Sequence, residues 1–454
     1  MAKRRRSPQR KRVGRVSYYQ HHGAWYLYYR DGQRPVRQRV ADDEATAAQM
    51  AAQVNAQLAS SAPTAFSFQS ITIEELRRGF LTHHEQVLKS SLATVNRYRT
   101  ATQYLENFAR QKGANKKAHE LNASHFVAWL RQLEISPNGH PHSEKRSLRD
   151  KGLRYIIDVC RSLYAYAAKH RHLPPYTDNP FSKLDVDRMR IEDAKPIYVF
   201  DHDSELAFFK QADDWVFPIH FVLAKTGIRV GELIHLLIED LDLEAGWLHI
   251  RNKETLGWKV KTRRERMVPL IQEVSMVLNR VMGDRTAGPL FLRHHFNHQE
   301  SLLGKVSQDS LEQSLRDRLK QAAAVANAPL TPTDQARMAR SVWQDAGAIK
   351  ADRVRTSYIR TAKRAGLPSI TCPKSWRHTF ATLLQDANVD PLIRQITLGH
   401  QPSDESRGGL GMTGVYTHTR AATQQREIER ALRMWPKSLN LAECWAQTLP
   451  TQVD

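Results

Sequence analysis

The sequence predicts a mainly helical protein with small β-sheets, an α+β class. Over most of the chain, apolar residues recur every three or four positions, which is the spacing of amphipathic helices. Two short regions, 15–40 and 247–270, instead show strand-like patterns interrupted by turn residues. Apolar residues make up 41% of the 454 residues. That is ample for hydrophobic cores in about two to four domains.

The chain carries a large excess of positive charge, which is densest near its start. Lysines and arginines total 68 against 47 acidic residues, for a net charge of +21, and seven of the basic residues fall within 3–12. Such an excess argues for a polyanionic partner, with nucleic acid the first candidate and an anionic membrane surface the alternative. No apolar run approaches the roughly 20 residues of a membrane-spanning helix.

The N-terminal region is expected to form a small sheet and one helix. Residues 15–60 contain three strand patterns, and the aromatic run 25–29 forms the central one. Asp31 and Gly32 give a strong two-residue turn signal after it. With the basic tail, residues 1–62 are therefore predicted to form the first domain.

The next region, 68–184, is predicted to be a helical domain. Apolar residues at helical spacing mark four helices, and we interpret these stripes as core. Thr72 and Glu75 have the spacing of a capping box at the first helix start.

The largest unit is expected to span residues 196–436. Helical patterns in it flank a β-hairpin over 247–270. A polar, largely helical stretch over 293–352 is long enough to suggest an insertion, and 437–454 gives only weak signals, typical of a C-terminal tail.

Neither a metal nor a cofactor is expected. The three cysteines Cys160, Cys372 and Cys444 are far apart and lack CxxC spacing, and the twenty histidines show no ligand pattern. The basic N-terminus has no apolar segment behind it, so it is not a secretory signal. A reducing intracellular compartment, the cytoplasm, fits best.

Four short segments of the largest unit together carry the residues needed for phosphoryl transfer to a protein hydroxyl. Two arginines can clamp a phosphate, and preorganised donors stabilise the charge of the transition state. A lysine can protonate a leaving alkoxide, a histidine can assist proton movement, and a tyrosine can form a covalent intermediate. The segments centre on Arg229, on Lys261, on Lys374 with Arg377, and on His400 followed by Tyr416.

These segments resemble a known family when they are taken together. TGIRVGEL, KTRRERMVPL, SWRHTFATLL, LGH and VYTH are similar, in order and spacing over 196–420, to the tyrosine recombinases, or phage integrases. The resemblance implies a tyrosine-recombinase catalytic fold, preceded by a helical core-site-binding domain and a small arm-binding domain. Each segment alone is weak evidence for the family, because most arginines at helix starts are simply solvated and most lysines at hairpin turns serve solubility.

The resemblance also implies a role for each residue. Arg229 and Arg377 would be the clamp arginines, Lys261 the hairpin lysine, His400 the histidine-or-tryptophan position, and Tyr416 the nucleophile. Lys261 suits the family better than Lys253 or Lys259, because it lies eight residues before Pro269.

Two departures from the family pattern stand out. Lys374 occupies the place of the usual histidine, three residues before Arg377. We expect it to touch the scissile phosphate as a cation, because a lysine is not a neutral base near pH 7. The gap from His400 to Tyr416 is also longer than usual.

The implied function is site-specific recombination for the integration or excision of a mobile element. The enzyme would cleave and rejoin double-stranded DNA through a 3′-phosphotyrosine, as a tetramer on paired sites. It would work in the cytoplasm at the nucleoid, with room for accessory DNA-bending or directionality factors. Two alternatives stay open: a catalytically weakened relative that acts as a sequence-specific DNA-binding protein, which Lys374 favours, and a relaxing topoisomerase.

Overall fold

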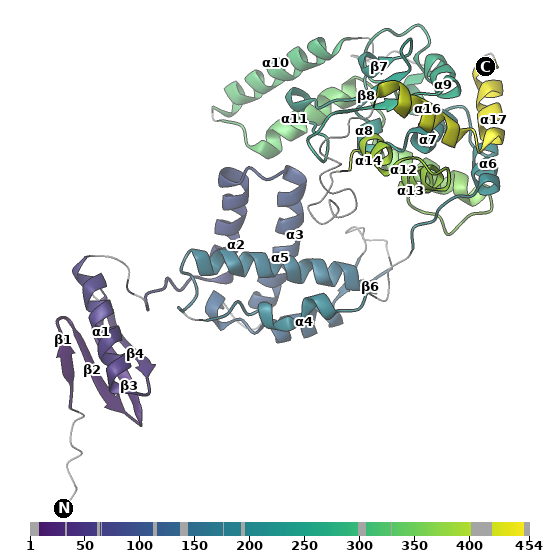
Figure 1. The fold of residues 1–454 in the computed structure, drawn as a ribbon. Helices are drawn as coiled ribbons and strands as arrows, with labels where there is room; N and C mark the ends of the chain where they lie inside the picture. The colour runs from purple at the N-terminus through teal and green to yellow at the C-terminus, as the bar shows by residue number, and fades with distance from the viewer. Residues whose placement is uncertain are drawn as a thin grey trace, which may run out of the picture. The chain divides into compact units, whose positions relative to one another are not determined.

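The computed structural model describes residues 9–31, 34–60, 64, 66–111, 116–136, 144–175, 177–191, 196–297, 306–327, 329–400 and 420–448 (Figure 1). The chain divides into two compact units, residues 1–195 and 196–454. Helices dominate both, and three small antiparallel sheets accompany them in the described ranges, which confirms the mainly helical α+β class. Within those ranges, no helix is long and apolar enough to cross a membrane.

The first unit opens with an antiparallel sheet whose strands lie in chain order (Figure 1). It has one strand more than the sequence predicted, because the end of the basic segment pairs with the next strand across a turn at Gly14. A single helix covers one face of the sheet. These elements are β1 (Lys11–Val13), β2 (Val16–His21), β3 (Ala24–Asp31), β4 (Arg34–Ala41) and α1 (Glu44–Ala59).

The aromatic residues of this sheet divide between its two faces. Tyr18 and Tyr29 pack with α1 in the small core. On strands β2 and β3, Tyr19 pairs with Tyr26, and their rings stack with centroids 6.2 Å apart. The Arg37 guanidinium lies 5.0 Å from the centre of the Tyr26 ring. One face therefore builds the core, and the other presents arginines on tyrosine rings.

The rest of the first unit is helical, and the predicted apolar stripes form its core. Leu76, Phe80, Leu105, Phe126 and Leu163 are all buried in one cluster. The elements are α2 (Ile73–Thr82), a π-helical turn (His83–Val87), α3 (Leu92–Arg110), α4 (Ala123–Gln132), β5 (Glu134–Ile135), β6 (Arg146–Ser147) and α5 (Asp150–Lys169).

The second unit packs helices around a three-stranded antiparallel sheet. Its first helices are α6 (His202–Lys210), α7 (Val216–Thr226) and α8 (Val230–Leu233). The sheet follows as β7 (Leu241–Asp242), β8 (Trp247–Ile250) and β9 (Arg266–Pro269). The remaining helices are α9 (Gln272–Met282), α10 (Gln308–Ala326), α11 (Pro332–Asp345), α12 (Ala351–Arg364), α13 (Lys374–Asp386), α14 (Pro391–Leu398), α16 (Ala421–Leu432) and α17 (Pro436–Gln447).

Two sequence expectations for this unit have different outcomes. The β-hairpin forms as predicted, with Trp247 opposite Pro269. The separate tail expected after residue 436 is wrong for most of its length, because α17 buries Leu439 and Ala442 in the main core. The mixed polar and apolar sequence of α17 gives only a weak helical pattern, so the helix was not predicted. It contacts α9 and α6.

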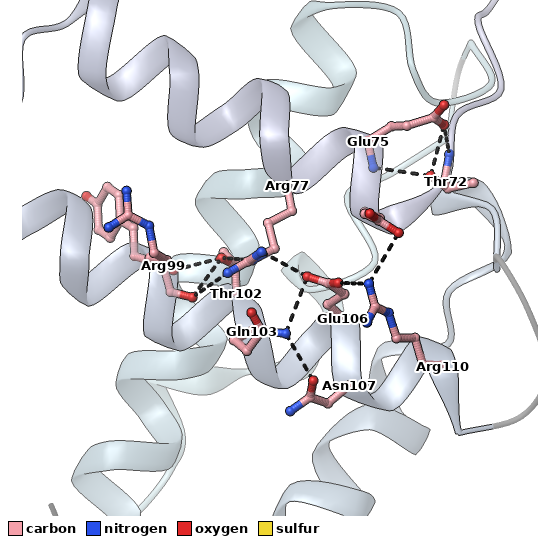
Figure 2. Close-up of polar contacts among 11 residues, drawn as sticks. Thr72, Glu75, Arg77, Arg99, Thr102, Gln103, Glu106, Asn107 and Arg110 are labelled. Carbon is pink, nitrogen blue, oxygen red and sulfur yellow. Dashed lines mark hydrogen bonds and ion pairs between the residues drawn. The ribbon is translucent and has the colours of Figure 1, made fainter. Parts of the chain in front are cut away.

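A buried carboxylate links α2 and α3 in the helical part of the first unit (Figure 2). Glu106 on α3 is only 5% exposed. It accepts hydrogen bonds from Arg77 Nη1 at 2.9 Å, and Arg110 Nη2 lies 2.5 Å from its other oxygen. Figure 2 also shows the capping box, in which Thr72 Oγ1 accepts from the Glu75 amide at 3.1 Å and Glu75 accepts from the Thr72 amide at 2.7 Å.

We expect Glu106→Ala to destabilise this helical part by about 3 kcal/mol, because it leaves the partly buried Arg77 without its carboxylate. Arg110→Ala should cost less than about 1 kcal/mol, since the Arg110 side chain is 62% exposed. Hydrogen exchange in the full chain measures both. The slowest amides of α2 and α3 should exchange on the order of a hundredfold faster in Glu106→Ala. Equal effects of the two variants would contradict the assignment of Glu106 as the buried partner.

Candidate active site

Arg229 is positioned by a sharp end to helix α7. Gly227 ends that helix in the left-handed conformation (φ +62°), and a Cβ there would lie 2.4 Å from the Phe380 ring. Any other residue at Gly227 would therefore meet both backbone strain and a clash. The chain then turns so that Arg229 caps α8, where its backbone N–H and its Nη1 each donate to Glu232 at 2.8 Å.

Arg377 lies in the first part of α13 and is only 8% exposed. Its Nη1 donates to the carbonyl of Gly227 at 2.8 Å, and its Nη2 donates to the carbonyl of Leu398. These bonds connect Arg377 to the turn between α7 and α8, which carries Arg229, and to the end of α14. Burial, followed by repulsion from Arg229, lowers the pKa of Arg377 to about 10, so it remains charged at neutral pH.

His400 directly follows α14 and the glycine that ends it. Asp390 caps this helix by accepting from the Leu392 amide at 2.7 Å, and Gly399 ends it in the left-handed conformation. His400 Nε2 then lies 3.0 Å from Arg377 Nη2. Because the guanidinium can only donate, Nε2 accepts and the ring proton is assigned to Nδ1. Burial, then the nearby Arg377, lowers the pKa of His400, which favours this neutral form.

Glu232 and Arg266 complete the cluster, and sequence reasoning missed both. Arg266, at the start of β9, donates to the two Glu232 oxygens at 3.1 and 2.7 Å, while its Nε donates to the Thr397 carbonyl at 3.0 Å. Glu232 is only 2% exposed. Burial alone would raise the pKa of Glu232, but the hydrogen bonds and charge of Arg266, together with the hydrogen bonds from Arg229, outweigh burial and lower the pKa. Glu232 therefore stays an anion that holds two arginines.

The cluster has a net positive charge. Arg229, Arg266 and Arg377 surround one described carboxylate, Glu232, so three charges less one leave two in excess. Like charges held this close repel unless an anion joins them. Planar guanidinium groups suit a phosphate or a carboxylate, because their N–H donors match two oxygens at once. The arrangement is therefore that of an oxyanion site.

Lys374 and His378 lie on α13 on either side of Arg377. Lys374 is the first residue of the helix and is exposed, one turn before Arg377. His378 is half-buried, and burial, then Lys374 and Arg377, lowers its pKa. Sequence reasoning missed His378, although it directly follows the predicted arginine in SWRHTF.

Among the described residues, no hydrogen bond joins Lys261 to the three arginines. It is exposed, in the loop between β8 and β9, and no ion pair found in the described ranges involves it. The two other lysines considered for the hairpin position each form an ion pair. Lys253 is buried and pairs with Asp240 at 2.7 Å, and Lys259 pairs with Glu254 at 2.8 Å.

The structure thus brings Arg229, Arg377 and His400 together, with Lys374 on the helix that carries Arg377. The predicted nucleophile Tyr416 lies outside the described residues. Within those residues, no group of three or more His, Cys, Asp or Glu side chains is arranged to hold a metal ion.

Comparisons with known proteins agree with the segments that build this site. The model of the Phage integrase family matches residues 218–422. A tyrosine recombinase XerC of Oceanobacillus iheyensis is 24% identical over 337 residues, covering 72% of this chain and 85% of that protein. The transposase of transposon Tn916 from Enterococcus faecalis is 23% identical over 353 residues, covering 73% and 72%.

Solved structures show weaker likenesses. An integrase of transposon Tn1549 in complex with a circular intermediate DNA is 19% identical, covers 80% of this chain and 100% of that one, and has a TM-score of 0.49. A lambda integrase tetramer bound to a Holliday junction is 15% identical, covers 86% and 96%, and has a TM-score of 0.46.

The family match spans all six residues selected from the sequence, three of which meet in the oxyanion site. The two sequence relatives are a tyrosine recombinase and a transposase. Residues 218–422 of this chain therefore form a domain of the phage integrase family, the tyrosine recombinases.

Proposed function

We propose that this chain is a site-specific recombinase that moves a mobile element by cleaving and rejoining double-stranded DNA. The observation that carries the proposal is the buried cluster of three arginines around Glu232, with His400 bonded to Arg377. Its excess positive charge suits the scissile phosphate. The net charge of +21 supports a polyanionic substrate.

The proposed chemistry uses one covalent step in each direction. The Tyr416 oxygen attacks phosphorus, a tyrosine–phosphorus bond forms at the 3′ side, and the bond from phosphorus to the 5′-oxygen breaks. Lys261 gives a proton to the departing 5′-oxygen, while the phenol proton passes to a neutral imidazole. We assign that imidazole to His378, because the Nε2 lone pair of His400 already accepts from Arg377. Rejoining reverses each transfer.

The proposed partner is double-stranded DNA at two paired sites, bound by a tetramer. The sheet face on which Arg37 lies over Tyr26 would take an accessory DNA site. Residues 1–62, 68–184 and 196–436 would serve as arm-binding, core-binding and catalytic domains. This work would take place in the cytoplasm at the nucleoid, with DNA-bending or directionality factors as accessory partners.

The second candidate function is sequence-specific DNA binding without catalysis, and Lys374 is the observation that favours it. A lysine at that place supplies a phosphate contact but no neutral base near pH 7. Unbiased covalent capture separates the two functions. The chain is incubated with sheared DNA that spans its coding sequence and both flanks, denatured with detergent, and retained fragments are sequenced. Enrichment of one short sequence supports the recombinase, and the absence of adducts overturns it.

Tyr416→Phe should keep specific DNA binding and abolish the covalent complex, because only the phenol oxygen is lost. The measurement is gel analysis on a nicked duplex of the captured sequence, from which the cleaved fragment escapes. Tyr358→Phe is the matched control, since Tyr358 is a buried core residue and its variant should still form the adduct. An adduct in Tyr416→Phe would move the nucleophile elsewhere.

Arg229→Ala and Arg377→Ala should each slow single-turnover cleavage on the order of 150-fold, about 3 kcal/mol, because each removes a preorganised donor to the phosphate. Arg433→Ala removes a guanidinium of the same unit that pairs with Glu273 and Glu429. It should cleave at close to the wild-type rate. Near-normal cleavage by either site variant would undo the assignment of the clamp.

Lys374→Ala should lower both the cleavage rate and the salt dependence of DNA binding, because about one phosphate contact disappears. Lys374→His should keep activity. Lys350→Ala, which removes an exposed lysine beside α12, is the control. Cleavage rates and binding constants over a salt series measure the effects. Unchanged behaviour of Lys374→Ala would leave it a solvated lysine, and a much faster Lys374→His would favour the DNA-binding alternative.

A further inference from the structure

Helices α10 and α11, here called the helical insert, form a second hydrophobic core in the catalytic unit. Figure 1 draws them as a pair beside β7 and β8. Leu311, Leu315, Val342 and Trp343 of the insert are buried in one cluster. That cluster also contains Leu256, which belongs to the loop that carries Lys261. The insert therefore packs against this loop.

The segment 251–265, here called the lysine loop, contacts the insert through its backbone as well. Trp343 Nε1 donates to the carbonyl of Leu256 at 3.1 Å in a buried position. The next residue, Gly257, has φ +73°, and a Cβ there would lie 2.8 Å from Cβ of Ala339. Helix α11 thus touches the loop closely enough to require glycine, and a buried hydrogen bond fixes the turn.

Aromatic contacts extend this support along the loop toward Lys261. The ring of Trp258 stacks on His235 with centroids 4.9 Å apart, and the same histidine meets the edge of Trp343 at 5.0 Å. Lys253 and Trp258 exchange two backbone hydrogen bonds of 3.0 Å. The contacts with the insert therefore support the lysine loop as far as Trp258, two residues before Val260.

Asn252 carries the constraint across Lys261 itself. Its Oδ1 accepts from the backbone N–H of Val260 at 2.9 Å, and its Nδ2 donates to the carbonyl of Arg263 at 3.3 Å. The Arg263 amide closes a turn by donating to the Val260 carbonyl at 2.8 Å. Lys261 is exposed inside this turn, while Val260 before it is buried. The backbone on both sides of the lysine is fixed.

We propose that the helical insert positions Lys261 for proton transfer to the 5′-oxygen, with Trp343 as the positioning residue. The inference rests on the proposed function, because it presumes that Lys261 donates the proton. A general acid acts only within hydrogen-bond reach of its acceptor, and small misplacement costs much of its effect. A solvated loop would leave the ammonium group spread over many positions. The insert and Asn252 restrict the backbone on both sides of Lys261 and so reduce this freedom.

The leaving group offers a test that isolates proton donation. A 5′-bridging sulfur replaces the 5′-oxygen in an otherwise identical nicked duplex of the captured sequence. A thiol has a pKa of about 8.5 and leaves without a proton, whereas an alkoxide resembles hydroxide, whose acid has a pKa of about 15.7. A variant that has lost only the positioned acid should be slow on oxygen and restored on sulfur.

Single-turnover cleavage is measured in the full chain with Trp343→Phe, Lys261→Ala and Trp215→Phe. Trp343→Phe keeps an aromatic ring but loses the N–H, and we expect about tenfold slower cleavage of the oxygen duplex, equivalent to one lost hydrogen bond. On the sulfur duplex it should match the wild type, as should Lys261→Ala. Trp215→Phe is the control, because its indole also donates to a backbone carbonyl, that of Leu292 at 2.9 Å, and it should cleave both duplexes normally.

Other outcomes overturn the proposal in distinguishable ways. Trp343→Phe that is equally slow on both duplexes, or normal on both, contradicts positioning by the insert. Lys261→Ala that stays slow on sulfur contradicts the role of Lys261 in the proposed function instead. Hydrogen exchange provides a second readout: amides of the lysine loop should lose protection in Trp343→Phe while those of α13 keep it. Unchanged loop protection would also overturn the proposal.

Discussion

The second unit depends on one buried anion, the carboxylate of Glu232. Removing a carboxylate from water costs several kcal/mol, and only close cationic partners offset that cost. Arg266 supplies a two-point contact from β9, and Arg229 supplies a third donor from the start of α8. The same carboxylate accepts the Arg229 backbone N–H. One side chain therefore fixes the direction of an arginine, starts a helix and attaches the sheet to it.

This arrangement separates the residues that would hold a phosphate from the residue that would donate a proton. The arginines are bonded to the core by carbonyls and by Glu232, so little reorganisation is needed when an anion arrives. Lys261 instead stands on a loop whose support comes from a different hydrophobic cluster. Cleavage would then require that the arginine cluster and the loop carrying Lys261, which are supported by different hydrophobic clusters, are both correctly placed at the same phosphate.

Sequence reasoning found the residues that carry a recognisable local pattern and missed those defined by distant partners. Arg229, Arg377 and His400 stand in short segments with helix boundaries that glycine and proline mark, so their grouping could be predicted. The Arg266–Glu232 pair could not, because a glutamate three residues after Arg229 looks like an ordinary solvated helix residue. Strand β1 was missed for a similar reason: its basic residues looked like a tail, and only pairing with β2 makes them a strand.

Arg377 is bonded at once to the end of α7, through the carbonyl of Gly227, and to the end of α14, through that of Leu398. A lysine has a single charged nitrogen and cannot reach two such carbonyls in fixed directions, so arginine is required there even before any DNA is bound. The bond also couples local unfolding. The last turn of α14 cannot open without leaving a buried guanidinium unsatisfied, so α14, α13 and the distant α7 should lose structure as a single cooperative unit.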